Sequence, residues 1–179
     1  MTVNDATVYA EALFMAALEA DSEQAVYTDV NSVVKAIQNA PEYIKLIDTP
    51  ALDKAKKHGL IECAFRDVHE LTVNLMKLLS DKSRFYCFEK IAHCYGKLYD
   101  AHNNILRGEV ISARALTSAQ MSTLTQKLCD QYGKRVVLTN TVDPDILGGL
   151  RLDIADTLID GSLRSRLCNI EKILKNTVI

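Results

Sequence analysis

The sequence lacks the features that mark several large classes of protein. No apolar run approaches the roughly 20 residues that a membrane-spanning helix needs. The opening Met-Thr-Val-Asn-Asp has no basic segment of the kind that begins a secretory or organellar signal. The net charge is only −2, which gives no basis for holding nucleic acid through its phosphates. We therefore expect a soluble, cytoplasmic protein with no nucleic-acid partner and no direct membrane insertion.

Recognisable metal or catalytic chemistry is also scarce. The five cysteines are odd in number and widely spaced, which favours reduced, buried thiols: Cys63, Cys87, Cys94, Cys129 and Cys168. On a helix, Cys87 and Cys94 would lie two turns apart on one side, but His93 would point about 100° away from Cys94. No further ligand completes a tetrahedral metal set with Cys87 and Cys94.

The acidic residues near the C-terminal end do not form a calcium loop, because they lack its alternating ligands and closing glutamate: Asp143, Asp145, Asp153, Asp156 and Asp160. His102 falls within an apolar helical stripe, which favours a hydrogen-bonded core histidine over a catalytic base. His58 and His69 have no obvious partners. We expect no catalytic residue, no metal and no cofactor.

The chain has 179 residues, 48% of them hydrophobic and 25% charged, which suits one ordinary globular domain or two small ones. Helical periodicity fills the first 106 residues, with short breaks that favour a compact bundle. The expected helices span residues 3–20, 22–39, 41–48, 50–65, 67–80 and 83–106. Thr49-Pro50 is expected to start the fourth of these helices.

The pattern changes near residue 107. A strand over 110–116 precedes a capping box, Thr117 to Gln120, whose helix ends at Gly133. A second strand follows over 136–138, and the predicted order is β-α-β-β-β-α. The fold class is therefore α+β, with an N-terminal six-helix bundle in residues 1–106 and a small α/β domain with a short mixed sheet in residues 107–179. Residues 1–106 contain 11 Lys and Arg and 15 Asp and Glu, which gives a net charge of −4. Residues 107–179 contain 10 Lys and Arg and 8 Asp and Glu, which gives +2.

Residues 143–167 carry the most informative pattern. Asp143-Pro144 bends the chain, and Gly148-Gly149 permits a backbone conformation that side chains disfavour. Leu150, Leu152 and Ile154 alternate as one face of a strand, and Asp160-Gly161 turns. Ser162 can cap a final helix that carries Leu163, Leu167, Ile170 and Leu174.

This stretch resembles the C-terminal signature of the delta subunit of F-type ATP synthases, the relative of mitochondrial oligomycin sensitivity conferral protein. The matching residues are Asp143, Gly148-Gly149, Ile154, Asp156, Ile159-Asp160-Gly161-Ser162-Leu163 and Arg166-Leu167. The resemblance covers essentially the whole chain: Tyr9-Ala10, Ala12-Leu13-Phe14 and Ala17 look like the family's first helix, 75–79 its fifth and 110–116 its first strand. Ala155 departs from the glycine that the family usually has before Asp156, and it would be strained if the turn needs a positive φ.

The first helix shows an unusually wide apolar surface. On a helical wheel, the apolar arc from Ala12 to Phe14 spans roughly 200°, whereas a surface helix needs only about 100° to face its own core. The fifth helix has a similar arc of roughly 160°. Both helices can lie centrally in the bundle, or they can form a groove that accepts a helix from another protein. The residues leave these two explanations open.

The family resemblance implies the second explanation. It implies a non-catalytic stator subunit of a proton-translocating F-type ATP synthase that links the catalytic head to the peripheral stalk and resists rotational torque. The N-terminal helix of an ATP synthase alpha subunit would lie between the first and fifth helices, and b-type peripheral-stalk subunits would bind the C-terminal domain. The candidate partner-binding residues are Tyr9, Ala12, Leu13, Ala16, Leu71, Leu75 and Leu79.

By the same resemblance the protein would lie at the cytoplasmic face of the cell inner membrane, as a peripheral part of the ATP synthase complex. The alternative is a free-standing helical adaptor with no enzymatic activity. That alternative would leave the pattern of residues 143–167 unexplained. A small hydrolase or transferase would need a convergent polar site, and no set of residues offers one.

Overall fold

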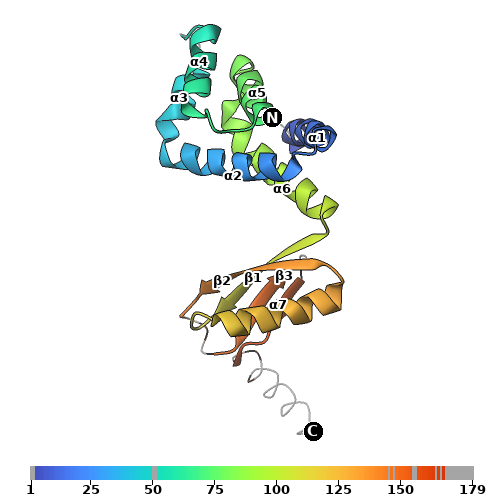
Figure 1. Cartoon of the computed structure of the whole chain (residues 1–179). Helices are drawn as coiled ribbons and strands as arrows, with labels where there is room; N and C mark the ends of the chain where they lie inside the picture. Colours follow the sequence, from blue (N-terminus) through green and yellow to red (C-terminus); the bar gives the residue numbers. More distant parts are fainter. Residues whose placement is uncertain are drawn as a thin grey trace. The chain divides into compact units, whose positions relative to one another are not determined.

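The computed structural model describes residues 3–49, 52–144, 146, 148–154, 157–163, 165 and 167. Contacts between residues divide the chain into two compact units, Met1–Tyr99 and Asp100–Ile179. This division falls at 99/100, whereas the sequence predicted a boundary at 106/107. The described residues of the first unit contain helices and one 3₁₀ turn (Figure 1): α1 (Val3–Glu19), α2 (Glu23–Asn39), α3 (Pro41–Asp48), α4 (Lys54–Ala64), α5 (Glu70–Asp81), η1 (Phe85–Cys87) and α6 (Phe88–His102).

Aromatic side chains organise the core of the first unit. Tyr95 on α6 is fully buried, its ring packs edge-on against Phe14 of α1, and its hydroxyl donates to the carbonyl of Glu23 at 3.1 Å. Tyr27 of α2 stacks on Tyr99 with ring centroids 4.5 Å apart. These contacts join α1, α2 and α6 and hold the three helices together.

Several helix ends differ from the sequence prediction. α4 begins at Lys54 after Asp53, and not at Pro50, which lies outside the described residues. α5 begins at Glu70, where the Nδ1 atom of His69 accepts a hydrogen bond from the backbone N–H of Leu71. α6 ends at His102, so the predicted core position of His102 is wrong: the residue is exposed at the end of the helix.

The second unit is built on a four-stranded mixed sheet with the order β2-β1-β3-β4. Its elements are β1 (Ile105–Ser112), α7 (Ser118–Tyr132), β2 (Arg135–Val142), β3 (Leu150–Ile154) and β4 (Thr157–Asp160). β1 and β2 are parallel and are connected through α7, whereas β3 runs antiparallel to β1 and to β4. The first strand therefore starts five residues before the predicted one, where the sequence suggested the end of a helix. The helical spacing of α6 continues in the sequence beyond the end of the helix at His102, as far as Ile105. This spacing explains why the start of the strand was predicted too late.

One face of the sheet packs on α7 (Figure 1), and the alternating strand residues form a core with it. The buried members are Val110, Leu128, Val136, Leu152 and Ile154. The predicted capping box is confirmed: Thr117 and Gln120 satisfy each other's backbone N–H groups, and Gly133 ends α7 in the left-handed conformation. Asn140, which the sequence did not single out, donates to the carbonyl of Val110 and accepts from the N–H of Leu116.

The α+β class with a mixed sheet is thus present. Within the described residues, no helix has both the length and the apolar character required to cross a membrane. None of the four described cysteines takes part in a disulfide among the described residues, and Cys63 is exposed where the sequence suggested burial. Cys168 and the predicted turn residue Ala155 lie outside the described residues.

Candidate partner-binding surface

The buried face of α1 is narrower than its apolar arc. Its buried residues are Ala6, Ala10, Leu13, Phe14 and Ala17. At 100° per residue these positions cover about 100° of the helix circumference, the width that a surface helix normally buries. Part of the 200° arc is therefore not used by the protein's own core.

The structure separates the seven predicted partner-binding residues by burial. Leu13, Leu75 and Leu79 are buried within the helical unit. Tyr9, Ala16 and Leu71 are half-buried, and Ala12 is exposed. The half-buried and exposed residues are therefore available to a partner as the helices stand, whereas the three buried leucines lie beneath that surface.

α5 packs beside α1 and presents a similar apolar edge. Leu71 is half-buried and Leu78, seven residues later on the same side of the helix, is 45% exposed. The adjoining side of α5 is core, with Thr72, Met76 and Leu79 fully buried. Both helices thus leave apolar side chains on the edge between their buried and exposed faces.

Three exposed apolar residues of these helices are not among the seven predicted partner-binding residues. Val8 and Met15 of α1 are 62% and 65% exposed, and Leu78 of α5 completes the group. The helical wheel placed Val8 and Met15 among the polar residues, outside the apolar arc. Two apolar side chains seven residues apart within a polar face are a signal that could have found them.

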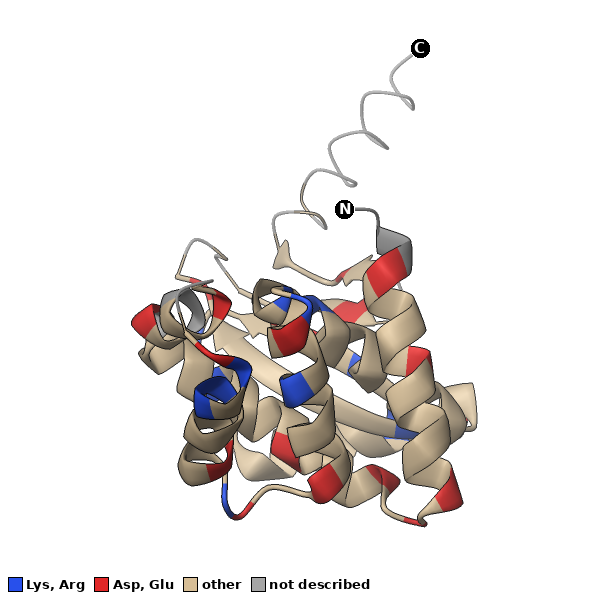
Figure 2. Cartoon of the chain, turned by 90° about the horizontal axis from the view of Figure 1, so that it is seen from above, with Lys and Arg blue, Asp and Glu red and all other residues tan. Residues whose placement is uncertain are grey.

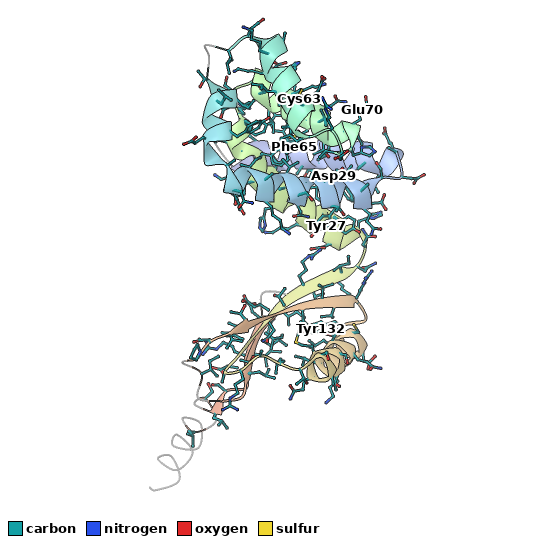
Figure 3. The ribbon with its side chains drawn as sticks, turned by 60° about the vertical axis from the view of Figure 1, so that its left-hand side comes forward. Tyr27, Asp29, Cys63, Phe65, Glu70 and Tyr132 are labelled. Atoms are coloured by element: carbon teal, nitrogen blue, oxygen red, sulfur yellow. The ribbon has the colours of Figure 1, made fainter. Side chains whose placement is uncertain are left out.

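Hydrogen bonds and ion pairs hold α5 in place. Figure 3 labels Asp29 of α2 and Glu70 at the start of α5. The backbone N–H of His69 donates to Asp29 of α2 at 2.6 Å, so the start of α5, next to Glu70, is tied to α2. His58 of α4 lies 3.2 Å from Asp81. Lys77 bonds Glu62 at 2.6 Å, and this hydrogen bond and its positive charge lower the pKa of the Glu62 carboxyl. His58 and His69, which lacked partners in the sequence, therefore help to fix α4 and α5.

The residues of the C-terminal signature bring two backbone segments into close contact. The N–H of Gly161 donates to the carbonyl of Leu150, and the N–H of Leu163 donates to the carbonyl of Gly148, both at 2.9 Å. Gly149 has φ +84°, and a Cβ there would lie 2.5 Å from the carbonyl oxygen of Gly161. The paired glycines are thus needed both for their backbone conformation and for this close approach.

Asp160 joins the end of β4 to the segment that follows it. Its carboxylate accepts from the N–H of Ser162 and the hydroxyl of Ser165, both at 2.9 Å, and lies 3.7 Å from Arg151 of β3. These hydrogen bonds, with a smaller contribution from the Arg151 charge, lower the pKa of Asp160 to about 2. The Ser162 hydroxyl accepts from the N–H of Ser165, as a helix cap does.

Side chains suited to metal or covalent chemistry are not gathered in the part of the chain that the structure describes. Searching those residues finds no group of three or more His, Cys, Asp or Glu that could hold a metal ion. Cys87 of η1 is buried and Cys94 of α6 is half-buried. The uncovered apolar edges of α1 and α5 are the kind of surface by which a protein binds other proteins.

Comparison with known proteins gives the family. The family model of the ATP synthase delta (OSCP) subunit matches residues 6–174. ATP synthase subunit delta of Lactobacillus johnsonii is 34% identical over 173 residues, covering 96% of this chain and 95% of that protein. Mitochondrial ATP synthase subunit 5 of Saccharomyces cerevisiae is 33% identical over 177 residues, covering 95% and 84%. The chain therefore belongs to the ATP synthase delta (OSCP) subunit family, a non-catalytic stator component of F-type ATP synthases.

A solved structure agrees with the fold. A chain in the cryo-EM structure of the Toxoplasma gondii mitochondrial ATP synthase hexamer superposes with a TM-score of 0.71 at 20% identity, covering 94% of this chain and 96% of that chain. The predicted family resemblance is confirmed by the family model and by the relatives named above.

Proposed function

We propose that this stator subunit links the catalytic head to the peripheral stalk by binding the N-terminal helix of an alpha subunit along α1 and α5. The observation that carries the proposal is the pair of adjacent helices that both leave apolar side chains uncovered. Tyr9, Ala12 and Ala16 lie on one edge of α1, and Leu71 and Leu78 lie on one edge of α5. An amphipathic helix can bury such edges in the helix-in-groove mode.

The small residues of α1 favour a close helix–helix contact. Ala12 and Ala16 are one turn apart, so a partner backbone can approach them without displacing a large side chain. Leu13, Leu75 and Leu79 lie below, and their burial keeps the two helices rigid. A preformed, rigid surface suits a stator, because it binds without a large ordering cost and resists torque through packing.

The second unit would bind the b-type subunits of the stalk. Its described C-terminal part exposes apolar side chains on β4 and in the residues that follow: Leu158, Ile159, Leu163 and Leu167. Exposed apolar residues that cluster at one end of a small unit favour a contact with another protein. The complex would hold the protein at the cytoplasmic face of the inner membrane as a peripheral component.

Ala16→Glu and Leu78→Glu test the head contact. Both place a carboxylate on the proposed surface while leaving the buried core unchanged, and each should weaken binding of a peptide copying the N-terminus of the cognate alpha subunit by at least about tenfold. Leu75→Asp is a poorer choice, because Leu75 is buried and the charge would destabilise the unit. Leu60→Glu on α4 is the matched control, since Leu60 is 39% exposed on another helix.

Unchanged peptide affinity in folded Ala16→Glu and Leu78→Glu variants would remove α1 and α5 from the interface and favour the free-standing adaptor. Leu158→Glu addresses the other contact separately. It should reduce co-purification with the stalk subunits while leaving the affinity for the alpha peptide unchanged.

A further inference from the structure

The exposed face of α1 combines apolar and acidic residues. Its exposed residues are Val8, Glu11, Ala12, Met15 and Glu19. At 100° per residue, all five fall within about 100° of the helix circumference and form one continuous stripe. Val8 and Met15 are the most exposed apolar side chains of the helix, and the two glutamates lie beside them.

This stripe belongs to a region whose ionisable side chains are all acidic. No Lys, Arg or His precedes Lys35, whereas six acidic residues do: Asp5, Glu11, Glu19, Asp21, Glu23 and Asp29. Figure 2 shows the helix that starts near the N-terminus with acidic positions and no basic ones. Among the described residues, no recorded ion pair involves Glu11 or Glu19. Within the part of the chain that the structure describes, their charges are therefore not neutralised by an ion pair.

The composition of the stripe restricts what can cover it. An anionic lipid surface or a nucleic acid would be repelled by Glu11, Glu19 and the neighbouring acids. A purely apolar helix would leave the carboxylates beside it partly desolvated and unpaired, which is costly. A helix that presents apolar residues to Val8 and Met15 and basic residues to the glutamates satisfies both parts of the stripe.

We infer that the partner helix is basic as well as amphipathic, with Lys or Arg beside its apolar face. The inference rests on the proposed function, since it describes the helix that binds along α1. Glu11 and Glu19 are eight residues apart, about 12 Å along the helix axis. Around the helix circumference Glu19 lies about 20° from Ala12 and about 60° from Ala16, so it borders the proposed contact directly. Glu11 lies about 100° from Ala12, so a long Lys or Arg side chain of the partner would be needed to reach it. The ion pairs fix the register and speed up encounter more than they raise affinity.

The double variant Glu11→Gln/Glu19→Gln tests the charge requirement. Binding is measured by calorimetry with the peptide copying the N-terminus of the cognate alpha subunit, at low and at high salt. At low salt, the affinity should fall by roughly 1.5- to 5-fold per carboxylate removed, and the salt dependence of binding should become weaker. Glu42→Gln/Glu89→Gln is the matched control, because both residues are exposed on α3 and α6 and should change neither quantity.

Reversing the charges of Glu11 and Glu19 distinguishes a direct contact with the partner from a structural role of these residues. Glu11→Lys/Glu19→Lys should bind the natural peptide worst, and a peptide whose Lys and Arg are replaced by Glu should restore binding to this variant only. If Ala16→Glu abolishes binding while both double variants keep the affinity and salt dependence of the natural protein, the inference is overturned and the proposed function stands. If Ala16→Glu also binds normally, both fail.

Discussion

Replacing Gly149 by alanine tests the packing of the C-terminal signature most directly. Gly149 lies where the chain enters β3, and it faces Gly161 and Ser162 beyond β4. The two backbone segments are held by hydrogen bonds of 2.9 Å from Gly161 to Leu150 and from Leu163 to Gly148. A side chain at Gly149 must push these segments apart or distort its own backbone.

The expected cost has two parts. A φ of +84° is unfavourable for alanine by about 1–2 kcal/mol. The added Cβ would lie 2.5 Å from the Gly161 carbonyl oxygen and 3.0 Å from the Ser162 Cα, both of them backbone atoms that cannot rotate away. Such overpacking costs a further 1–3 kcal/mol, roughly. The sum, about 2–5 kcal/mol, is a large fraction of the roughly 4–12 kcal/mol expected for a unit of about 80 residues.

Two other glycines separate these contributions. Gly133 has φ +63° but open space around a Cβ, so Gly133→Ala should cost only the conformational part, about 1–2 kcal/mol. Gly59 lies within α4 with no positive φ and nothing within 4 Å of a Cβ. Gly59→Ala should therefore stabilise its helix by up to about 1 kcal/mol.

Hydrogen exchange of the β3 and β4 amides measures the result within the unit itself. The chain has no tryptophan, so a fluorescence probe is not available without further substitution. Gly149→Ala should lower the protection of these strands far more than Gly133→Ala does, while the protection of α2 and α6 stays unchanged. Equal losses for the two variants would show that the contact with Gly161 adds nothing, contrary to the reasoning above.

Three further predictions concern polar groups. Thr72→Val and Ser80→Ala should each raise the free energy of unfolding by about 1 kcal/mol in denaturant titrations, because both hydroxyls are buried without a recorded partner. Thr117→Ala should destabilise α7 by about 1 kcal/mol through loss of its capping box, and normal α7 amide protection would contradict this. Asp160→Asn should lower stability only at higher pH: the folded-state pKa of about 2 lies below the unfolded value near 4, so the stabilisation is present above about pH 4 and disappears as the pH falls towards 2. A variant whose deficit persists at pH 2 would contradict this origin.

Local signals predicted the elements that carry their own start and stop residues. Thr117, Gln120 and Gly133 define both ends of α7 in the sequence, and the structure has the helix at 118–132. Their hydrogen bonds involve neighbours in the chain, so no tertiary information is needed to find them. The alternation of Leu150, Leu152 and Ile154 likewise identified β3.

Elements that depend on distant contacts were predicted less well. Ile105 continues the helical spacing of α6, but it pairs with Arg135 of β2 as the start of a parallel ladder. The partner strand is thirty residues away, so periodicity alone could not choose strand over helix. His69 is comparable: its cap on α5 and its bond to Asp29 depend on the position of α2.

The candidate partner-binding surface was likewise predicted only in part from the sequence. The helical wheel gave α1 an apolar arc of roughly 200° and left open whether the bundle buries all of it. In the structure the helix buries only about half of that arc. Which residues remain uncovered depends on where the other helices lie. Leu13, Leu75 and Leu79 looked equivalent to Tyr9 and Ala12 on a wheel, yet they are buried.

An uncovered apolar helix normally invites aggregation, and the residues of α1 limit that risk. Ala12 and Ala16 expose little apolar area each, and alanine loses no side-chain entropy when a partner covers it. Glu11 and Glu19 keep the stripe around Val8 and Met15 charged, so two copies of the protein would repel each other there. The same carboxylates attract a basic helix. If the partner is basic, one set of residues therefore serves both to keep the free protein apart and to recognise its partner.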